Sequence, residues 1–260
     1  MVRPLRVEFA GAFYHVLNRG NAGEAIFKSK KDRERFLDCI ARAVERFSLK
    51  IHTYCLMMNH YHLLVETPEP NLSKAIQLLN VSYATYFNRK YHRNGHLFQG
   101  RFKSILVDED AYLKYLSRYI HLNPVRAKLV EYPADYSWSS YREFIGKVNA
   151  NSWLEAKWLL RQFGRGKKEA IKNYRDFVEK IDFNTLENPE KDLISGYILG
   201  SADFVQWVKE THLYSRADEK EIPQLRELKS KIDVERIIDE VADEFNCSRY
   251  MILSKGRKRK

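Results

Sequence analysis

The sequence has few cysteines and no long apolar run. Only three cysteines occur in 260 residues, Cys39, Cys55 and Cys247, and no two of them form a C-x-x-C pair. This spacing argues against a disulfide framework or a cysteine-based zinc site and favours a reducing compartment. The opening MVRPLRVEFAG holds no apolar signal core, and no stretch approaches the ~20 apolar residues of a membrane span. We therefore expect a cytoplasmic protein with no membrane association.

Acidic residues are too few to balance the basic ones. The 45 Lys and Arg exceed the 34 Asp and Glu, which gives a formal net charge of +11. Residues 1–147 hold 23 basic and 14 acidic residues, whereas the remainder holds 22 and 20. An excess of this size indicates a polyanionic partner, nucleic acid before membrane. Charge alone fits a merely soluble basic surface equally well.

Apolar residues make up 44% of the chain, enough to bury a core. Hydrophobic periodicity and turn residues predict, in chain order, a strand at 12–20, a helix at 30–47, strands at 49–58 and 60–66, a helix at 71–91, a strand at 102–107 and a helix at 108–123. Pro124 is expected to end the last helix. The order β-α-β-β-α-β predicts an α+β fold with a ferredoxin-like sheet, to which the seventh element adds a tyrosine-bearing helix.

The chain after this fold is predicted to be mainly helical. We expect a first domain at 1–147 and a helical extension at 148–215. Residues 216–260 would follow as a charged linker and one more helical segment.

Two histidines lie one residue apart in the apolar run MMNHYHLLVE. On a strand, His60 and His62 point to the same face, and two parallel imidazoles can ligate one divalent metal. Two half-exposed strand histidines without a metal are the alternative. A third ligand has to come from elsewhere in the fold, and His15 on the first strand is expected to be structural.

The helix YLKYLSRYIHLNPVR offers that ligand. Tyr119 and Asn123 are four residues apart on one helix face, so the Asn123 amide oxygen could bind a metal beside the Tyr119 phenol. This suits attack by tyrosine on a phosphodiester, with Mg²⁺ or Mn²⁺ polarising a phosphate oxygen. Glu66 has no stronger claim than other groups to take the tyrosine proton. Tyr112 and Tyr115, in the same stripe, are expected in the core.

Basic and aromatic residues alternate in RKYHRNGHLFQGRFK. Cations pair with phosphates, and aromatic rings stack on unpaired bases. The alternative is a solvated loop with Phe98 and Phe102 in the core. The predicted DNA contacts are Arg89, Lys90, Arg93, Phe98, Arg101 and Lys103, and more weakly Arg3, Arg6 and Arg19.

Four separated motifs resemble a known family. NHYHLLVE resembles the HUH motif of single-strand DNA nucleases, and RYIHLNPVRA resembles the tyrosine motif of single-tyrosine transposases. The opening RPLRVEFAGAFYHVLNRGN and the loop GHLFQGRFKSILVD are similar to those of the REP-associated tyrosine transposases. The motifs stand in the expected order, and the resemblance covers about residues 1–146.

The resemblance implies a metal-dependent endonuclease and strand transferase that acts on single-stranded DNA. It implies His60, His62 and Asn123 as metal ligands, with Mg²⁺ or Mn²⁺ as the metal. Tyr119 would be the nucleophile, forming a 5′-phosphotyrosine link and freeing a 3′-OH. The implied substrate is a folded palindrome with a hairpin near the cleavage point, and a homodimer stays open.

The segment DVERIIDEVADEFNCSRYMILSKGRKRK is similar to the opening part of the DNA-binding domain of the replication initiator DnaA. Competing hypotheses remain for the chain as a whole. One is a non-catalytic DNA-binding regulator derived from a transposase, and another is an RNA endonuclease. A zinc hydrolase or structural metal protein would need a ligand cluster that the sequence does not offer. A covalent protein–DNA product distinguishes the transposase-like enzyme from all of these.

Overall fold

The computed structural model describes residues 6–180, 191, 193, 194 and 196–213. By their contacts, Arg6–Trp207 form one unit, and the second unit is described only over Val208–Leu213, which includes a π-helical turn at Lys209–Leu213. Arg3, the predicted linker and the DnaA-like segment lie outside the described residues.

A mainly antiparallel sheet forms the centre of the first unit. Its four long strands are β1 (Ala12–Arg19), β2 (Lys50–Leu56), β3 (His60–Thr67) and β4 (Lys103–Val107). Their order, β2-β3-β1-β4, with antiparallel pairing between neighbours, confirms the predicted ferredoxin-like sheet. A short fifth strand, β5 (Ile198–Leu199), pairs in parallel with β4. The sequence did not predict β5, because two residues carry no readable alternation.

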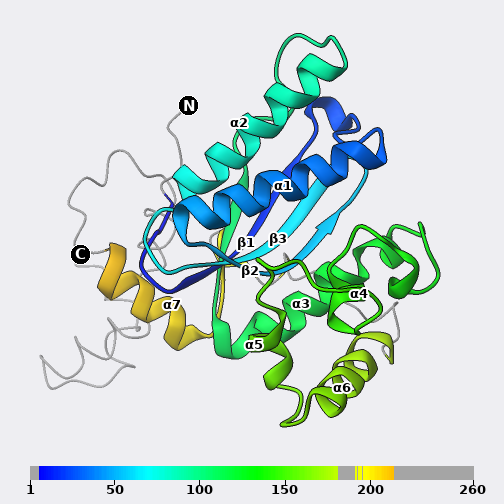
Figure 1. The fold of residues 1–260 in the computed structure, drawn as a ribbon. Helices are drawn as coiled ribbons and strands as arrows, with labels where there is room; N and C mark the ends of the chain where they lie inside the picture. Colours follow the sequence, from blue (N-terminus) through cyan, green and yellow to red (C-terminus); the bar gives the residue numbers. More distant parts are fainter. Residues whose placement is uncertain (1–5, 181–190, 192, 195, 214–260) are drawn as a thin grey trace, which may run out of the picture. The chain divides into compact units, whose positions relative to one another are not determined.

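Helices cover both faces of this sheet. Helices α1 (Lys30–Phe47) and α2 (Leu72–Lys90) lie over one face, and α3 (Glu109–Arg126) lies over the other (Figure 1). The α1 side holds an aromatic core in which the rings of Phe36 and Tyr61 are 4.8 Å apart. Because side chains alternate along a strand, the neighbours of Tyr61 on β3 face α3 instead.

Local sequence signals set the helix ends. Ser29 and Asp32 form a capping box at the start of α1, and Ser48 closes that helix in the left-handed conformation (φ 54°). The prediction that Pro124 ends α3 was wrong, because the helix continues to Arg126. Pro124 lies in the last turn, where its missing N–H removes a single hydrogen bond and the helix stops two residues later.

The part of the chain after α3 that the structure describes is mainly helical, as predicted, and its residues before 181 pack on the α3 side of the sheet. The Glu155 N–H donates to the Ile51 carbonyl of β2 at 2.8 Å. His121 of α3 bonds Ser140 at 2.7 Å and Tyr174 at 2.6 Å. The boundary predicted at 147/148 stays a prediction. The helices of this segment are α4 (Tyr141–Phe144), α5 (Ala156–Arg161), α6 (Lys167–Glu179) and α7 (Ala202–Val208).

Within the described residues, no helix is both long enough and apolar enough to cross a bilayer.

Candidate active site

The histidine pair of β3 lies against α3 at the tyrosine. The ring centres of His60 and His62 are 4.9 Å apart. The Tyr119 ring stands edge-on to His62, with 6.2 Å between ring centres. One helical turn further, the Asn123 amide nitrogen donates to the Tyr119 carbonyl at 3.0 Å. That bond leaves the Asn123 Oδ1 as the atom that could ligate a cation.

Both histidines of the pair have an imidazole nitrogen suited to a cation. The Nδ1 of His60 is 2.7 Å from the Oδ1 of Asn59. An amide oxygen can only accept, so His60 carries its proton on Nδ1 and its lone pair on Nε2. The Nε2 of His62 is buried and has no hydrogen-bond partner. Burial lowers the pKa of both rings, helped by the charge of Arg19 at His60 and by His15, His60 and Arg126 at His62, so both are the neutral imidazoles that bind metals.

His15 is a member of this site that sequence reasoning missed. Its Nε2 lies 2.9 Å from the Nδ1 of His62, and the two rings stack with their centres 5.1 Å apart. Burial lowers the pKa of His15 to about 3. The contact follows from the β1–β3 register, in which Leu17 pairs with His62 and His15 is the diagonal neighbour on the same face. A single sequence does not reveal that register, so His15 was assigned a structural role.

Arg126 is a second residue that was missed. Its guanidinium carbon lies 4.7 Å from the centre of the Tyr119 ring. The spacing i, i+7 on α3 puts both side chains on one helix face. That spacing was readable in RYIHLNPVRA, and it could have identified Arg126 as a cation beside the tyrosine.

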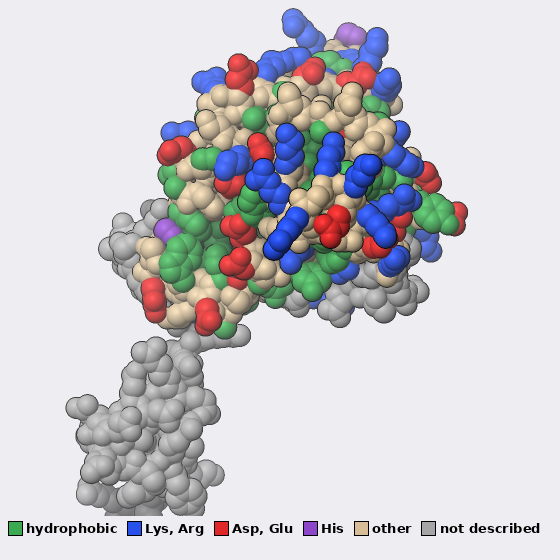
Figure 2. Space-filling view, turned by 60° about the horizontal axis from the view of Figure 1, so that its bottom comes forward, with side chains coloured by type: hydrophobic (Ala, Val, Ile, Leu, Met, Phe, Trp, Pro, Cys, Tyr) green, Lys and Arg blue, Asp and Glu red, His purple; other side chains and the backbone are tan. Residues whose placement is uncertain are grey.

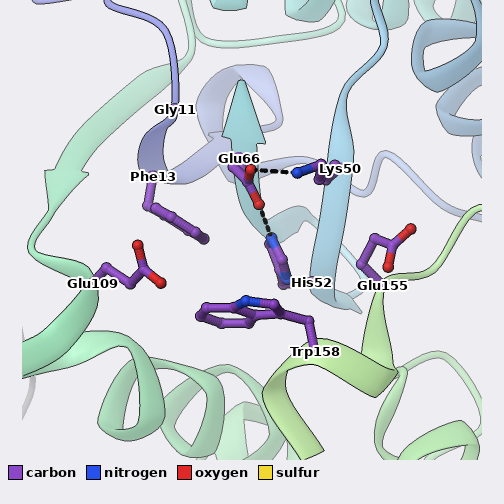
Figure 3. Close-up of a pocket in the computed structure, with 8 residues that line it drawn as sticks. All are labelled: Gly11, Phe13, Lys50, His52, Glu66, Glu109, Glu155 and Trp158. Atoms are coloured by element: carbon purple, nitrogen blue, oxygen red, sulfur yellow. Dashed lines mark hydrogen bonds and ion pairs between the residues drawn. The ribbon is translucent and has the colours of Figure 1, made fainter. Parts of the chain in front are cut away.

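Glu66 belongs to a different hollow, of about 370 Å³, on the same side of the sheet (Figure 3). Its carboxylate accepts a hydrogen bond from Lys50 Nζ at 2.6 Å and pairs with His52 Nε2 at 2.9 Å. Trp158 packs edge-on against His52, with 5.1 Å between ring centres. Glu66 lies four positions along β3 from His62, a span of about 13 Å. Glu66 is therefore not placed to take the Tyr119 proton directly.

Some predicted DNA contacts have partners within the fold. Lys90 Nζ lies 2.5 Å from the buried carboxylate of Asp32, and Arg93 lies 2.5 Å from Glu24. Phe98 is 8% exposed, which supports the alternative of a core phenylalanine and argues against a base-stacking role.

Arg6 is likewise engaged by the fold. Its guanidinium carbon lies 3.4 Å from the centre of the Phe102 ring, and its Nε donates to Ser104 at 3.1 Å. For all nine residues predicted to contact DNA, that role stays a prediction. The four that are exposed in the structure are Arg19, Arg89, Arg101 and Lys103.

Basic side chains gather on one face of the described structure. Figure 2 shows Lys and Arg close together over the middle of the face that it draws, with carboxylates among and around them. Such a surface attracts a polyanion.

Carboxylates and thiols contribute little to the candidate cation site. Across the described ranges, no three His, Cys, Asp or Glu side chains are grouped so that they could hold a metal ion. A cation at this site would depend on two imidazoles and an amide oxygen, a donor set that suits a divalent metal which keeps water or substrate oxygens as further ligands.

Comparison with known proteins gives matches over part of the chain. Residues 9–123 match the family described as Transposase IS200 like. A Haemophilus influenzae protein named as a REP-associated tyrosine transposase is 25% identical in an alignment of 130 positions, which covers 45% of this chain and 74% of that protein. The resemblance to DnaA is not among these matches.

Solved structures of transposases are similar at low identity. The structure of a REP-associated tyrosine transposase bound to a REP hairpin is 16% identical, with a TM-score of 0.48, over 60% of this chain and 98% of that chain. A transposase structure from Deinococcus radiodurans is 14% identical, with a TM-score of 0.33, over 49% and 92%.

Proposed function

Because residues 9–123 match the IS200-like transposases, we propose that this chain is a transposase-like enzyme that cuts and rejoins single-stranded DNA through Tyr119. The match supports the transposase-like function in general. The chemistry rests on one observation: the buried Nε2 of His62 has no partner, and its ring lies edge-on to Tyr119. An unsatisfied buried nitrogen beside a tyrosine is what a cation site at a phosphodiester would need.

The proposed cation ligands are the Nε2 atoms of His60 and His62 and the Oδ1 of Asn123. A bound Mg²⁺ or Mn²⁺ would polarise a phosphate oxygen there. The Tyr119 phenol attacks the phosphorus and the bond to the 3′ oxygen breaks. The products are a 5′-phosphotyrosine and a free 3′-OH.

The chain holds Tyr119 ready for this attack by packing its ring on several sides. The ring is 7% exposed, stands edge-on to His15 and His62, and lies under the Arg126 guanidinium. A fixed ring keeps the phenol in one orientation, which lowers the entropic cost of reaching the phosphate.

The proposed partner is single-stranded DNA that folds into a hairpin. The net charge of +11 and the basic face in Figure 2 support an anionic partner of this kind. A homodimer and a cytoplasmic location stay predictions. A regulator that binds DNA without cutting it remains the second candidate, and it predicts binding without any covalent product.

A cleavage assay tests the proposal. The full chain is incubated with 3′-labelled single strands that carry the inverted repeats flanking its own gene, with Mn²⁺ or with EDTA. We expect a labelled adduct that resists SDS, forms with Mn²⁺ and disappears with EDTA and in Tyr119→Phe. Tyr115→Phe is the matched control, because Tyr115 lies on the same helix but is 55% exposed.

Two results would contradict the proposal in different ways. An adduct that persists in Tyr119→Phe would mean that another residue is the nucleophile. Tight hairpin binding with no adduct under any metal condition would favour the DNA-binding regulator.

A further inference from the structure

The two histidines of the pair are held in parallel ways. In each, the Nδ1 atom makes a hydrogen bond: His60 to the Oδ1 of Asn59 at 2.7 Å, and His62 to the Nε2 of His15 at 2.9 Å. In each, the Nε2 atom remains for a cation. His15 is thus the hydrogen-bond partner of the His62 Nδ1, just as Asn59 is the partner of the His60 Nδ1.

We propose that His15 is a positioning residue for the metal, whose Nε2 accepts a hydrogen bond from the Nδ1–H of His62 and so keeps the lone pair of His62 on Nε2. The inference rests on the proposed function, since it concerns the same cation site. Outer acceptors of this kind fix both the tautomer and the orientation of a ligating imidazole. A histidine in this role needs a lone pair on its Nε2, which a neutral ring protonated on Nδ1 has.

If the hydrogen bond ran in the opposite direction, His62 would have a buried N–H group without an acceptor. If His15 donated, His62 would carry its proton on Nε2. That N–H would be buried with no acceptor, because this atom has no hydrogen-bond partner among the described residues. A buried donor without a partner is costly, whereas a lone pair at the same position is satisfied by a cation. The surroundings of His62 therefore favour the tautomer that binds metal.

The fold keeps His15 in place. The ring is 2% exposed, stacks on His62 with 19° between the planes, and meets the Tyr119 ring edge-on at 6.2 Å between centres. A single side chain from β1 thus contacts a proposed ligand on β3 and the proposed nucleophile on α3. Its loss would disturb metal binding first, because the hydrogen bond goes to the ligand.

Nitrogen NMR of the histidine rings in the metal-free protein tests the tautomer directly. We expect His62 to carry its proton on Nδ1 in the wild type and in His15→Gln, whose amide oxygen can accept in place of the His15 Nε2. In His15→Leu we expect the proton of His62 to move to Nε2 or to exchange between the two nitrogens. A wild-type His62 protonated on Nε2 would overturn the inference, whether or not the protein binds metal.

Manganese titration followed by electron paramagnetic resonance supplies the second readout. We expect His15→Leu to bind Mn²⁺ roughly 10–100-fold more weakly than the wild type, and His15→Gln to stay close to the wild type. The matched control is His121→Leu, which removes another buried histidine whose partners are Ser140 and Tyr174. It should leave Mn²⁺ affinity unchanged, and circular dichroism verifies that each variant is folded.

The outcomes separate this inference from the proposed function. A wild type that binds no Mn²⁺ contradicts the metal site itself. A wild type that binds Mn²⁺, together with a folded His15→Leu that binds it equally well, overturns the role of His15 alone. A loss in His15→Leu that His15→Gln does not restore would mean that packing, and not the hydrogen bond, is what matters.

Discussion

Arg126 brings a fixed positive charge to the residue on which the proposed chemistry depends. A guanidinium 4.7 Å from the centre of the Tyr119 ring holds that ring by a cation–π contact. An exposed arginine at this place can also contact the phosphate that the tyrosine attacks. Both effects act on the reaction step, so they should appear in the rate of adduct formation.

We expect Arg126→Ala to slow single-turnover adduct formation on the order of tenfold, the scale of one cation–π contact of about 1–2 kcal/mol. Lys128→Ala, at an exposed cation two residues further on, is the control for general loss of charge. Equal rates of adduct formation for Arg126→Ala and the wild type at saturating DNA would show that Arg126 has no role in the reaction step.

The sequence predicted those site residues whose relative placement depends on a single strand or a single helix. The common face of His60 and His62 follows from the period of a strand, and that of Tyr119 and Asn123 follows from the turn of a helix. His15 depends on how β1 is registered against β3, which local periodicity does not encode. Glu66 and His52 also lie on two different strands, so their contact could not be predicted from local periodicity.

At the scale of elements, a buried carboxylate joins α1 to α2. Asp32 caps α1, accepts a hydrogen bond from Lys90 Nζ at 2.5 Å, and accepts another from the Tyr91 hydroxyl at 2.7 Å. Burial alone would raise its pKa, but the bonds from Lys90, Tyr91 and the backbone of Lys28 lower it to about 2. Lys90 therefore links the end of α2 to α1. This structural role is an alternative to the DNA contact predicted for the same lysine.

We expect Lys90→Met to lower the thermal unfolding midpoint, because Asp32 would keep a buried charge without its cation. Arg89→Met is the matched control on the same turn of α2, where the side chain is exposed. It should leave the midpoint unchanged and weaken binding of a single-stranded hairpin in fluorescence anisotropy. If Lys90→Met kept the wild-type unfolding midpoint but bound DNA more weakly, Lys90 would be a DNA contact and not a structural residue.

The elements that periodicity predicted well are those with strong local signals. α1 has a capping box and a clear apolar face, and its predicted bounds match the observed helix. The expectation of a buried Tyr115 was wrong, since it is 55% exposed. At 3.6 residues per turn, Tyr115 is rotated about 40° from Tyr119 and about 60° from Tyr112, enough to turn it to solvent beside Phe177, with 6.0 Å between ring centres.

At the scale of the whole Arg6–Trp207 unit, a buried histidine couples stability to pH. His121 ties α3 to the segment after it through Ser140 and Tyr174. Burial lowers its pKa from 6.5 to about 3. The unfolded chain takes up a proton at this residue below pH 6.5, whereas the folded chain does so only near pH 3. Its contribution to stability is therefore complete above pH 6.5 and is lost as the pH falls from 6.5 to 3.

We expect the free energy of unfolding to fall by about 2 kcal/mol between pH 7 and pH 5 on account of His121. Urea titrations of the metal-free protein at the two pH values measure it. His121→Leu should be less stable than the wild type at pH 7, since Ser140 and Tyr174 each lose one buried hydrogen bond. It should lose correspondingly less stability on acidification. An equal pH dependence in both proteins would show that His121 is already protonated in the folded state.

In the proposed reaction, Tyr119 becomes covalently bound to the 5′ end of cleaved DNA. The most direct measurement digests the purified adduct with nuclease and protease and locates the remaining nucleotide on the peptides by mass spectrometry. We expect a phosphodiester-linked nucleotide on Tyr119 and on no other tyrosine of α3. A nucleotide on Tyr112, Tyr115 or a residue outside this helix would contradict it.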